Sequence, residues 1–266
     1  PIHSSAASDV YKRQSLLVGS TFTKSLAISF NKPFIPTNHL EGHILSTSFN
    51  NNIKFPNLVL LLTGGHTQVY LMKSENEIEL LGQSVDDAIG EAFDKTAKLI
   101  GLSYPGGSEI EEQALKGNED KFVLPKPLVK EKNFNFSFSG IKTNINIFKK
   151  KNKIDKKFVE DLSASFQKNI TEILIEKLDR GLKRLSSENK NIRSISVVGG
   201  VSNNKYIRSK IENFFVEKNI EIYYPIKEMM GDNAAMIAWA CMKFYKKDRS
   251  DLFFKPMPRL GVKSVL

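Results

Sequence analysis

The sequence contains very little cysteine and no long apolar run, and each absence excludes a class of protein. Its single cysteine, Cys241, excludes an internal disulfide and a cysteine-based zinc cluster, which fits a reducing compartment. No apolar stretch approaches the roughly 20 residues that a membrane-spanning helix needs, and stretches such as 58–62 are strand-sized. Residues 1–14 lack the basic and apolar regions of a signal peptide. We therefore expect a cytoplasmic protein with no membrane association.

Three widespread motifs are also absent. The sequence has no Gly-x-Gly-x-x-Gly dinucleotide fingerprint, no Walker A loop and no Gly-x-Ser-x-Gly nucleophile elbow. These absences argue against the usual dehydrogenases, P-loop enzymes and α/β-hydrolases.

Basic residues are plentiful, with 39 Lys and Arg against 29 Asp and Glu and a net charge of +10. This balance favours partners that carry phosphate, although a lysine-rich solvated surface explains it equally well. The same two interpretations apply to a stretch in which lysines alternate with phenylalanines, which indicates either a nucleic-acid surface or core aromatics flanked by solvated lysines: Lys126, Lys130, Lys132, Phe134, Phe136, Phe138 and Lys142.

The apolar periodicity predicts a layered α/β architecture. Strands are expected at 57–63, 67–72, 78–83, 192–198 and 220–224, with the first two joined as a β-hairpin. Helices are expected at 16–30, 39–48, 86–100, 157–185 and 203–215, and after Asp232. Residues 104–107 form a predicted rigid turn, 115–155 are predicted to be irregular, and Cys241 is predicted to be buried.

His39 and His43 are the first candidate ligands. On a helix, side chains four residues apart lie on one face and can bind one metal ion through two imidazoles. Glu41 is rotated by about 200° from His39, so it lies on the opposite face, unlike the general base of a His-Glu-x-x-His peptidase. Asp232 opens the last helix, where it is either an N-cap or the oxygen ligand that completes the site.

Two Gly-Gly turns are candidate phosphate cradles. Gly64-Gly65 follows one strand within the hairpin, and Gly199-Gly200 follows the buried strand 192–198 at the start of a helix. Most such turns are only turns, yet the second has the context in which α/β sheets bind ligands. Asp87, Glu91 and Asp94 share one helical face, which indicates a ligand, a bound cation, or a solvated surface relieved by neighbouring lysines.

Taken together, an ordered set of motifs resembles the bacterial tRNA threonylcarbamoyladenosine transferase family, TsaD, also called Gcp. The resemblance covers residues 15 to about 258. The motifs are Asn38-His39-Leu40-Glu41-Gly42-His43, Thr63-Gly64-Gly65-His66-Thr67-Gln68, Asp86-Asp87-Ala88, Gly90-Glu91-Ala92-Phe93-Asp94-Lys95, Tyr104-Pro105-Gly106-Gly107, Phe136-Ser137-Phe138-Ser139-Gly140, Gly199-Gly200-Val201-Ser202 and Asp232-Asn233.

The resemblance implies an actin-like ATPase fold of two lobes. It also implies transfer of threonylcarbamoyl from threonylcarbamoyl-AMP to N6 of the adenosine beside the anticodon, at position 37, in tRNAs that read codons beginning with adenine. The family's metal ligands correspond to His39, His43 and Asp232, with Fe²⁺ the expected ion and Zn²⁺ the alternative. Its substrate contacts correspond to Leu61, Leu62, Thr63, Gly64, Gly65, Asp94, Gly107 and Asn204, of which Asp94 is suited to accept hydrogen bonds from ribose hydroxyls. No general base is assigned.

The same resemblance implies partners and domain boundaries. The expected partners are tRNA and the proteins TsaB and TsaE. Residues 1–14 are interpreted as a leader foreign to the family, and 15–56 as the remainder of an incomplete first lobe. The second lobe is expected at 57–240, with an insertion at about 103–155, and 241–266 is expected to pack back on the first lobe. An O-carbamoyltransferase, a non-catalytic scaffold like TsaB and a metallopeptidase are the rival interpretations.

Overall fold

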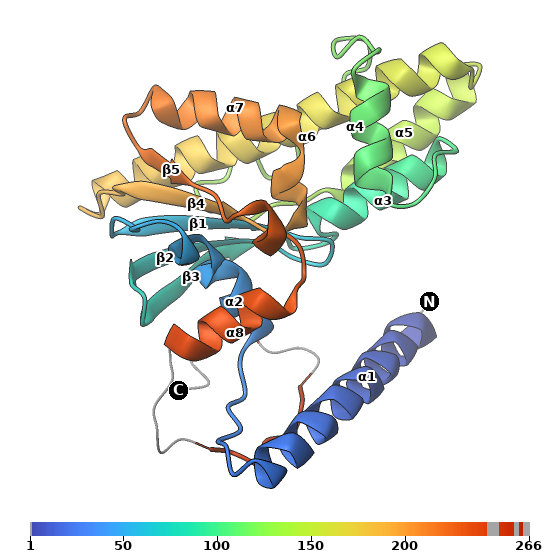
Figure 1. Cartoon of the computed structure of the whole chain (residues 1–266). Coiled ribbons are helices and arrows are strands. Elements are labelled where there is room, and N and C mark those ends of the chain that lie inside the picture. Colours follow the sequence, from blue (N-terminus) through green and yellow to red (C-terminus); the bar gives the residue numbers. More distant parts are fainter. Residues whose placement is uncertain (1, 244–249, 258–260, 263–266) are drawn as a thin grey trace. The chain divides into compact units, whose positions relative to one another are not determined.

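The computed structural model describes residues 2–243, 250–257 and 261–262 (Figure 1). The chain forms two compact units, which we call the terminal unit (Pro1–Leu45 with Asn233–Leu266) and the central unit (Ser46–Asp232). The predicted domain limits stay a prediction, and the predicted C-terminal segment 241–266 lies partly outside the described residues. No helix in the described residues has the length and apolar character needed to cross a bilayer.

Within its described residues the terminal unit contains three helices, α1 (Ile2–Ser29), α2 (His39–Leu45) and α8 (Ala234–Lys243). Helix α1 covers the predicted span 16–30 up to Ser29 but begins at Ile2, within residues for which the sequence gives no apolar periodicity. Helix α2 packs closely on α8, because a Cβ on Gly42 would lie 2.9 Å from Cδ1 of Ile237. The indole of Trp239 also donates to the carbonyl of Leu45 at 3.1 Å.

The central unit is built on a five-stranded mixed sheet with the order β3-β2-β1-β4-β5. Its strands are β1 (Asn57–Leu62), β2 (Thr67–Ser74), β3 (Glu77–Gln83), β4 (Ser194–Val198) and β5 (Glu221–Tyr223). The first three form an antiparallel meander, whereas β4 is parallel to β1 and to β5. All five predicted strands and the predicted hairpin are therefore confirmed.

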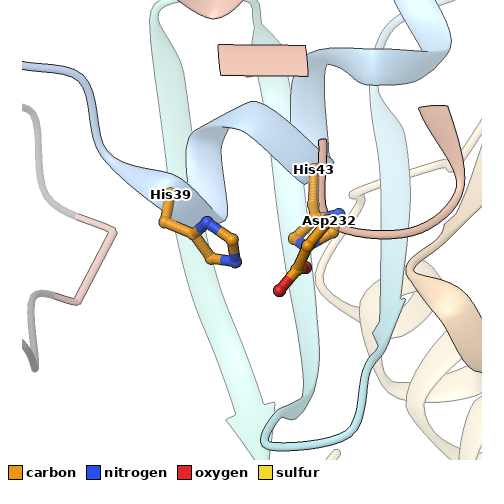
Figure 2. Close-up of side chains that lie close together, drawn as sticks. All are labelled: His39, His43 and Asp232. Atoms are coloured by element: carbon orange, nitrogen blue, oxygen red, sulfur yellow. The ribbon is translucent and has the colours of Figure 1, made fainter. Parts of the chain in front are cut away.

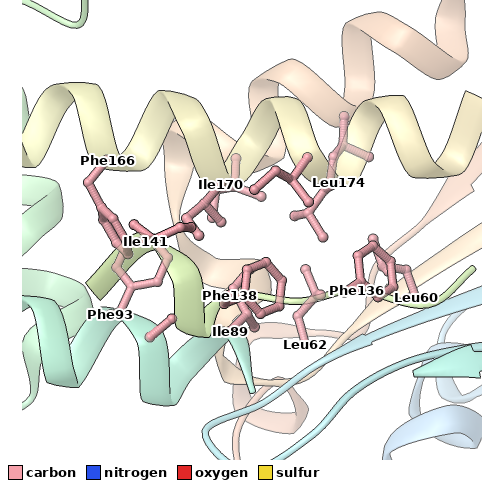
Figure 3. Packing of buried hydrophobic residues seen from close by; sticks show 14 of the residues in the cluster. Leu60, Leu62, Ile89, Phe93, Phe136, Phe138, Ile141, Phe166, Ile170 and Leu174 are labelled. Carbon is pink, nitrogen blue, oxygen red and sulfur yellow. The ribbon is translucent and has the colours of Figure 1, made fainter. Parts of the chain in front are cut away.

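Five α-helices complete this unit: α3 (Ile89–Leu99), α4 (Gly106–Ala114), α5 (Ser139–Lys151), α6 (Lys156–Ser187) and α7 (Lys205–Val216). Short 3₁₀ turns, η1 (Ser46–Phe49), η2 (Gly200–Asn203) and η3 (Lys227–Met229), join the elements. Figure 3 shows the core, in which Ile170 and Leu174 of α6 lie opposite Leu60 and Leu62 of β1. Burial of this apolar surface provides the main driving force for folding of the unit.

Three sequence predictions need correction. The region 115–155 is not irregular throughout, because α5 occupies 139–151 and buries Ile141 and Ile145 on one face among its lysines and asparagines. Cys241 is half-buried rather than buried. The α-helix that begins at His39 ends at Leu45, and η1 continues it to Phe49.

In the stretch where lysines alternate with phenylalanines, the aromatic rings are part of the hydrophobic core. Phe134, Phe136 and Phe138 are each at most 2% exposed, so their rings are not available to stack on bases. Lys126 forms ion pairs with Glu172 and Glu176 of α6. The hypothesis that these aromatics face a nucleic acid is therefore wrong.

Candidate functional site

The two histidines lie on one face of α2, as their spacing predicts. Asn38 caps the helix, since its Oδ1 accepts hydrogen bonds from the N–H groups of Leu40 at 2.8 Å and Glu41 at 3.4 Å. The rings of His39 and His43 then lie 4.9 Å apart, edge to face. His39 is exposed and His43 is buried, so one imidazole of the pair is accessible to solvent and the other lies inside the protein.

Asp232 lies immediately before α8, and it is not the residue that caps this helix. The cap is Asn233, whose Oδ1 accepts the N–H of Met236 at 2.8 Å. The capping interpretation of Asp232 is therefore wrong. The sequence allows Asp232 to be either the N-cap or a metal ligand, whereas in the structure the N-cap is Asn233.

His39, His43 and Asp232 come together, as Figure 2 shows. Each offers one ligand atom, and these atoms lie within 4.8 Å of one another. Two imidazoles and one carboxylate are a donor set that suits a divalent transition metal, and a 2-His-1-carboxylate group is typical of non-haem Fe(II) sites. Glu41 does not belong to this group in the described part of the chain; it is buried, and burial raises the pKa of its carboxyl.

The two Gly-Gly turns lie together at the carboxyl ends of β1 and β4. These strands pair in parallel with Leu61 opposite Val198, so the turns that follow them leave the same edge of the sheet. Gly199 adopts a φ of +94°, and a Cβ there would lie 2.4 Å from the carbonyl oxygen of Leu62. Only glycine fits this close approach. The edge at the carboxyl ends of parallel strands is where open α/β sheets bind ligands.

The turn between β1 and β2 has exposed N–H groups. Thr63 closes it, with its N–H donating to the carbonyl of His66 at 2.8 Å and its Oγ1 accepting the His66 N–H at 2.9 Å. The N–H groups of Gly64 and Gly65 donate no hydrogen bond within the described residues, and nothing lies within 4 Å of a Cβ built on either glycine. Two such N–H groups can bind an anion or a carbonyl oxygen.

Helix α3 holds this turn from the other side. The N–H groups of Gly90 and Glu91 donate to the carbonyls of Thr63 at 3.3 Å and Gly64 at 3.2 Å. A Cβ on Gly90 would lie 2.6 Å from the Cα of Gly64, so this glycine allows the contact. The carbonyls of the turn are thereby fixed, whereas its N–H groups stay exposed.

The other candidate substrate residues continue from α3. Oδ1 of Asp94 accepts the N–H of Gly106 at 2.8 Å, which places Gly107 and the start of α4 beside it. Glu111 of α4 accepts the N–H of Lys205 at 2.7 Å, directly after Asn204. Asn204 is buried and caps α7 through the N–H of Ile207 at 2.9 Å. Contacts through α3 and α4 thus connect the Gly64-Gly65 turn with Asp94, Gly107 and Asn204 in one rim of the central unit, whereas Leu61 and Leu62 are fully buried in β1.

The acidic face of α3 is mainly a solvated surface. Asp87 precedes the helix and forms an ion pair with Lys95, whose ammonium also lies 3.8 Å from Glu91. Glu91 further accepts the N–H of Ala88 at 3.3 Å, which caps the helix start. The predicted relief by a neighbouring lysine is therefore confirmed.

The family model for TsaD, tRNA N6-adenosine threonylcarbamoyltransferase, matches residues 13–239. The chain belongs to this family. It is 43% identical to the tRNA N6-adenosine threonylcarbamoyltransferase of Thermosipho africanus, over 93% of this chain and 74% of that protein. It is 44% identical to the protein of the same name from Pelagibacter ubique, over 92% and 69%.

A solved structure supports the fold. Full-length HypF in its phosphate- and nucleotide-bound form is similar with a TM-score of 0.59 and 15% identity, over 82% of this chain and 37% of HypF. The TsaD-family chain therefore has the α/β, actin-like ATPase fold that the motifs implied.

One residue of structural importance near the site, Asp86, has no local sequence pattern that predicts its role. Asp86 of this TsaD-family chain accepts hydrogen bonds from the Ser137 hydroxyl, from the Phe138 N–H at 2.8 Å, and from the Ser139 hydroxyl at 2.8 Å and N–H at 3.3 Å. Burial raises the pKa of this carboxyl, but the four hydrogen bonds outweigh that effect and hold it below its ordinary value. In the sequence, Asp86 and Ser137 to Ser139 are distinguished only because each lies in a motif of the family resemblance.

Proposed function

We propose that this chain transfers the threonylcarbamoyl group from threonylcarbamoyl-AMP to N6 of adenosine 37 in tRNAs that read codons beginning with adenine. The observation that supports this most directly is family membership, with relatives of that name at 43–44% identity over more than nine tenths of the chain. The connected rim at the carboxyl ends of β1 and β4 is suited to bind the adenylate.

The reaction is an acyl transfer. N6 of the adenosine attacks the carbamoyl carbon, the new C–N bond forms, the C–O bond to the AMP phosphate breaks, and N6 loses one proton. The exposed N–H groups of Gly64 and Gly65 would bind a phosphate or carbonyl oxygen and stabilise the charge that develops there. Asp94, fixed by Gly106, would accept hydrogen bonds from ribose hydroxyls. Asn204 and Gly107 would complete the contacts to the small substrate.

His39, His43 and Asp232 would hold one divalent ion, Fe²⁺ by donor type and Zn²⁺ as the alternative. When bound, such an ion supplies Lewis-acid polarisation of phosphate or carbamoyl oxygens. TsaB and TsaE are the proposed protein partners, and the cytoplasm, where tRNA is modified, is the proposed location.

The deciding experiment is reconstituted tRNA modification with the full-length protein, TsaB, TsaE and threonylcarbamoyl-AMP. We expect His39→Ala and Asp232→Ala each to lower kcat/KM at least about 100-fold, since metal polarisation contributes several kcal/mol. Bound metal, measured by elemental analysis of the purified proteins, should fall in both variants.

Asn233→Ala is the matched control, because this neighbour caps α8 and is not a ligand. It should lose about 1 kcal/mol of stability and keep its metal and its activity. Full activity in His39→Ala and Asp232→Ala would remove the metal from the mechanism. Metal-dependent peptide cleavage without tRNA modification would favour the peptidase.

A further inference from the structure

A small open pocket lies beside the last turns of α3 and the loop that leads to α4. Its volume is about 260 Å³, and it is lined by Asp94, Lys95, Lys98, Leu102, Ser103 and Tyr104. Of these residues only Asp94 belongs to the candidate substrate site. The pocket therefore extends that site outward along α3.

Tyr104 provides the aromatic surface of the pocket. It is 85% exposed, although Leu102 beside it is half-buried. A single exposed aromatic residue is ordinary on a protein surface. Here, however, it lines a hollow together with charged side chains, so its exposed ring is available to stack on a flat ligand.

Lys98 provides the available positive charge. Lys95 is partly neutralised by Asp87 and Glu91, whereas Lys98 is exposed and forms no ion pair within the described ranges of the chain. The ammonium of Lys149 on α5 donates to the carbonyl of Leu99, so a second cation lies at the same end of α3. Cations at this position attract phosphate.

We propose that this pocket takes one unpaired nucleotide of the tRNA substrate, with its base stacked on Tyr104 and its phosphate bound by Lys98. An aromatic ring and a cation match the base and the phosphate of a nucleotide unit, while Asp94 stays assigned to the ribose of the adenylate. The adenylate of the small substrate has the same chemistry, but the turns at the ends of β1 and β4 already offer it contacts. Unpaired loop nucleotides are the ones that stack on exposed aromatic side chains.

This inference rests on the proposed transferase function, and the test separates the two. In the reconstituted reaction, Tyr104→Ala should raise the KM for tRNA about tenfold, since one stacked base contributes this order of affinity. Its kcat and its KM for threonylcarbamoyl-AMP should stay unchanged. Tyr104→Phe, which keeps the ring, should restore the KM for tRNA.

The charge is tested separately. Lys98→Ala should reduce the slope of log K for tRNA binding against log salt concentration by about 1, as expected for the loss of one phosphate contact. Lys183→Ala is the matched control, because this lysine of α6 is 74% exposed and is paired with Asp179. It removes the same charge outside the pocket and should leave the slope unchanged.

Binding of an anticodon stem-loop RNA, followed by fluorescence anisotropy, needs no catalysis. Weaker RNA binding by Tyr104→Ala would support the pocket even if the wild-type protein transferred nothing, in which case only the proposed function would fail. An increase confined to the KM for threonylcarbamoyl-AMP would overturn the tRNA assignment in favour of the adenylate. Unchanged RNA binding and unchanged KM values in both pocket variants would overturn the proposal entirely.

Discussion

At the scale of single residues, Asp86 joins two segments that are distant in sequence. Its carboxylate precedes α3 and accepts the N–H groups of Phe138 and Ser139, at the start of α5. A helix start has N–H groups without partners inside the helix, so a carboxylate from elsewhere can act as its cap. Asp86 thereby attaches the start of α5 to the segment between β3 and α3.

Asp86→Asn should lower the free energy of unfolding by about 1 kcal/mol at neutral pH, a magnitude typical of a lost cap. Because the folded pKa lies below the ordinary value of 3.8, the contribution is complete above that pH and is lost as the pH falls through the folded pKa. The stability difference between wild type and variant should therefore be constant from pH 5 to 8 and shrink below about pH 4. Urea denaturation at several pH values measures it.

Asp120→Asn is the control for this prediction, since the Asp120 side chain is 74% exposed and forms a surface ion pair with Lys168. Surface pairs of this kind contribute little to stability. A pH-independent difference for Asp86→Asn would show that its hydrogen bonds do not depend on the carboxylate charge.

At the scale of elements, the approach of β1 and β4 depends on one glycine of a consecutive pair. Gly199→Ala places a Cβ 2.4 Å from the Leu62 carbonyl in a left-handed conformation, whereas a Cβ on Gly200 meets nothing within 4 Å. We expect Gly199→Ala to destabilise the protein by about 2 kcal/mol or more and Gly200→Ala to change it by less than about 0.5 kcal/mol. Thermal unfolding of the two variants side by side measures the contrast.

The sequence predicts the elements whose apolar pattern is regular. The hairpin of β1 and β2, the long helix α6 and the strand β4 have regularly spaced apolar residues, so periodicity identifies them, although their buried faces also carry polar side chains such as Asn57, Lys177 and Ser196. Helix α5 was missed because only Ile141 and Ile145 are buried among its lysines and asparagines. Its start is stabilised by Asp86, a tertiary contact that no local pattern contains.

The site was predictable to a similar extent. Helical spacing alone places His39 and His43 on one face, and their proximity to Asp232 agrees with the set that the resemblance implied. Which of Asp232 and Asn233 caps α8 was not predictable, since both residue types are good caps. Only the hydrogen bond from the Met236 N–H to Asn233 distinguishes them. The role of Tyr104 also needed the structure, because exposure and pocket shape are properties of the folded chain.

At the scale of the whole molecule, the net charge of +10 has a measurable consequence. Lysines that contact phosphates release bound counterions, so affinity for tRNA falls as salt rises. We expect the dissociation constant for unmodified tRNA to increase at least about tenfold between 50 and 200 mM salt. Filter binding measures this change, and a salt-independent affinity would show that the excess charge lies away from the RNA.

The parallel pairing of β1 with β4 also has a consequence for how the chain folds. Leu61 and Val198 are neighbours in the sheet, yet β2, β3 and the helices α3 to α6 separate them along the chain. During synthesis one edge of β1 stays unpaired until β4 has been made. Such long-range pairing forms slowly, and the unpaired edge is prone to aggregation in the meantime. The two glycine turns meet only after this step, so affinity for the adenylate, the substrate that we propose for this edge of the sheet, would report completion of the sheet during refolding.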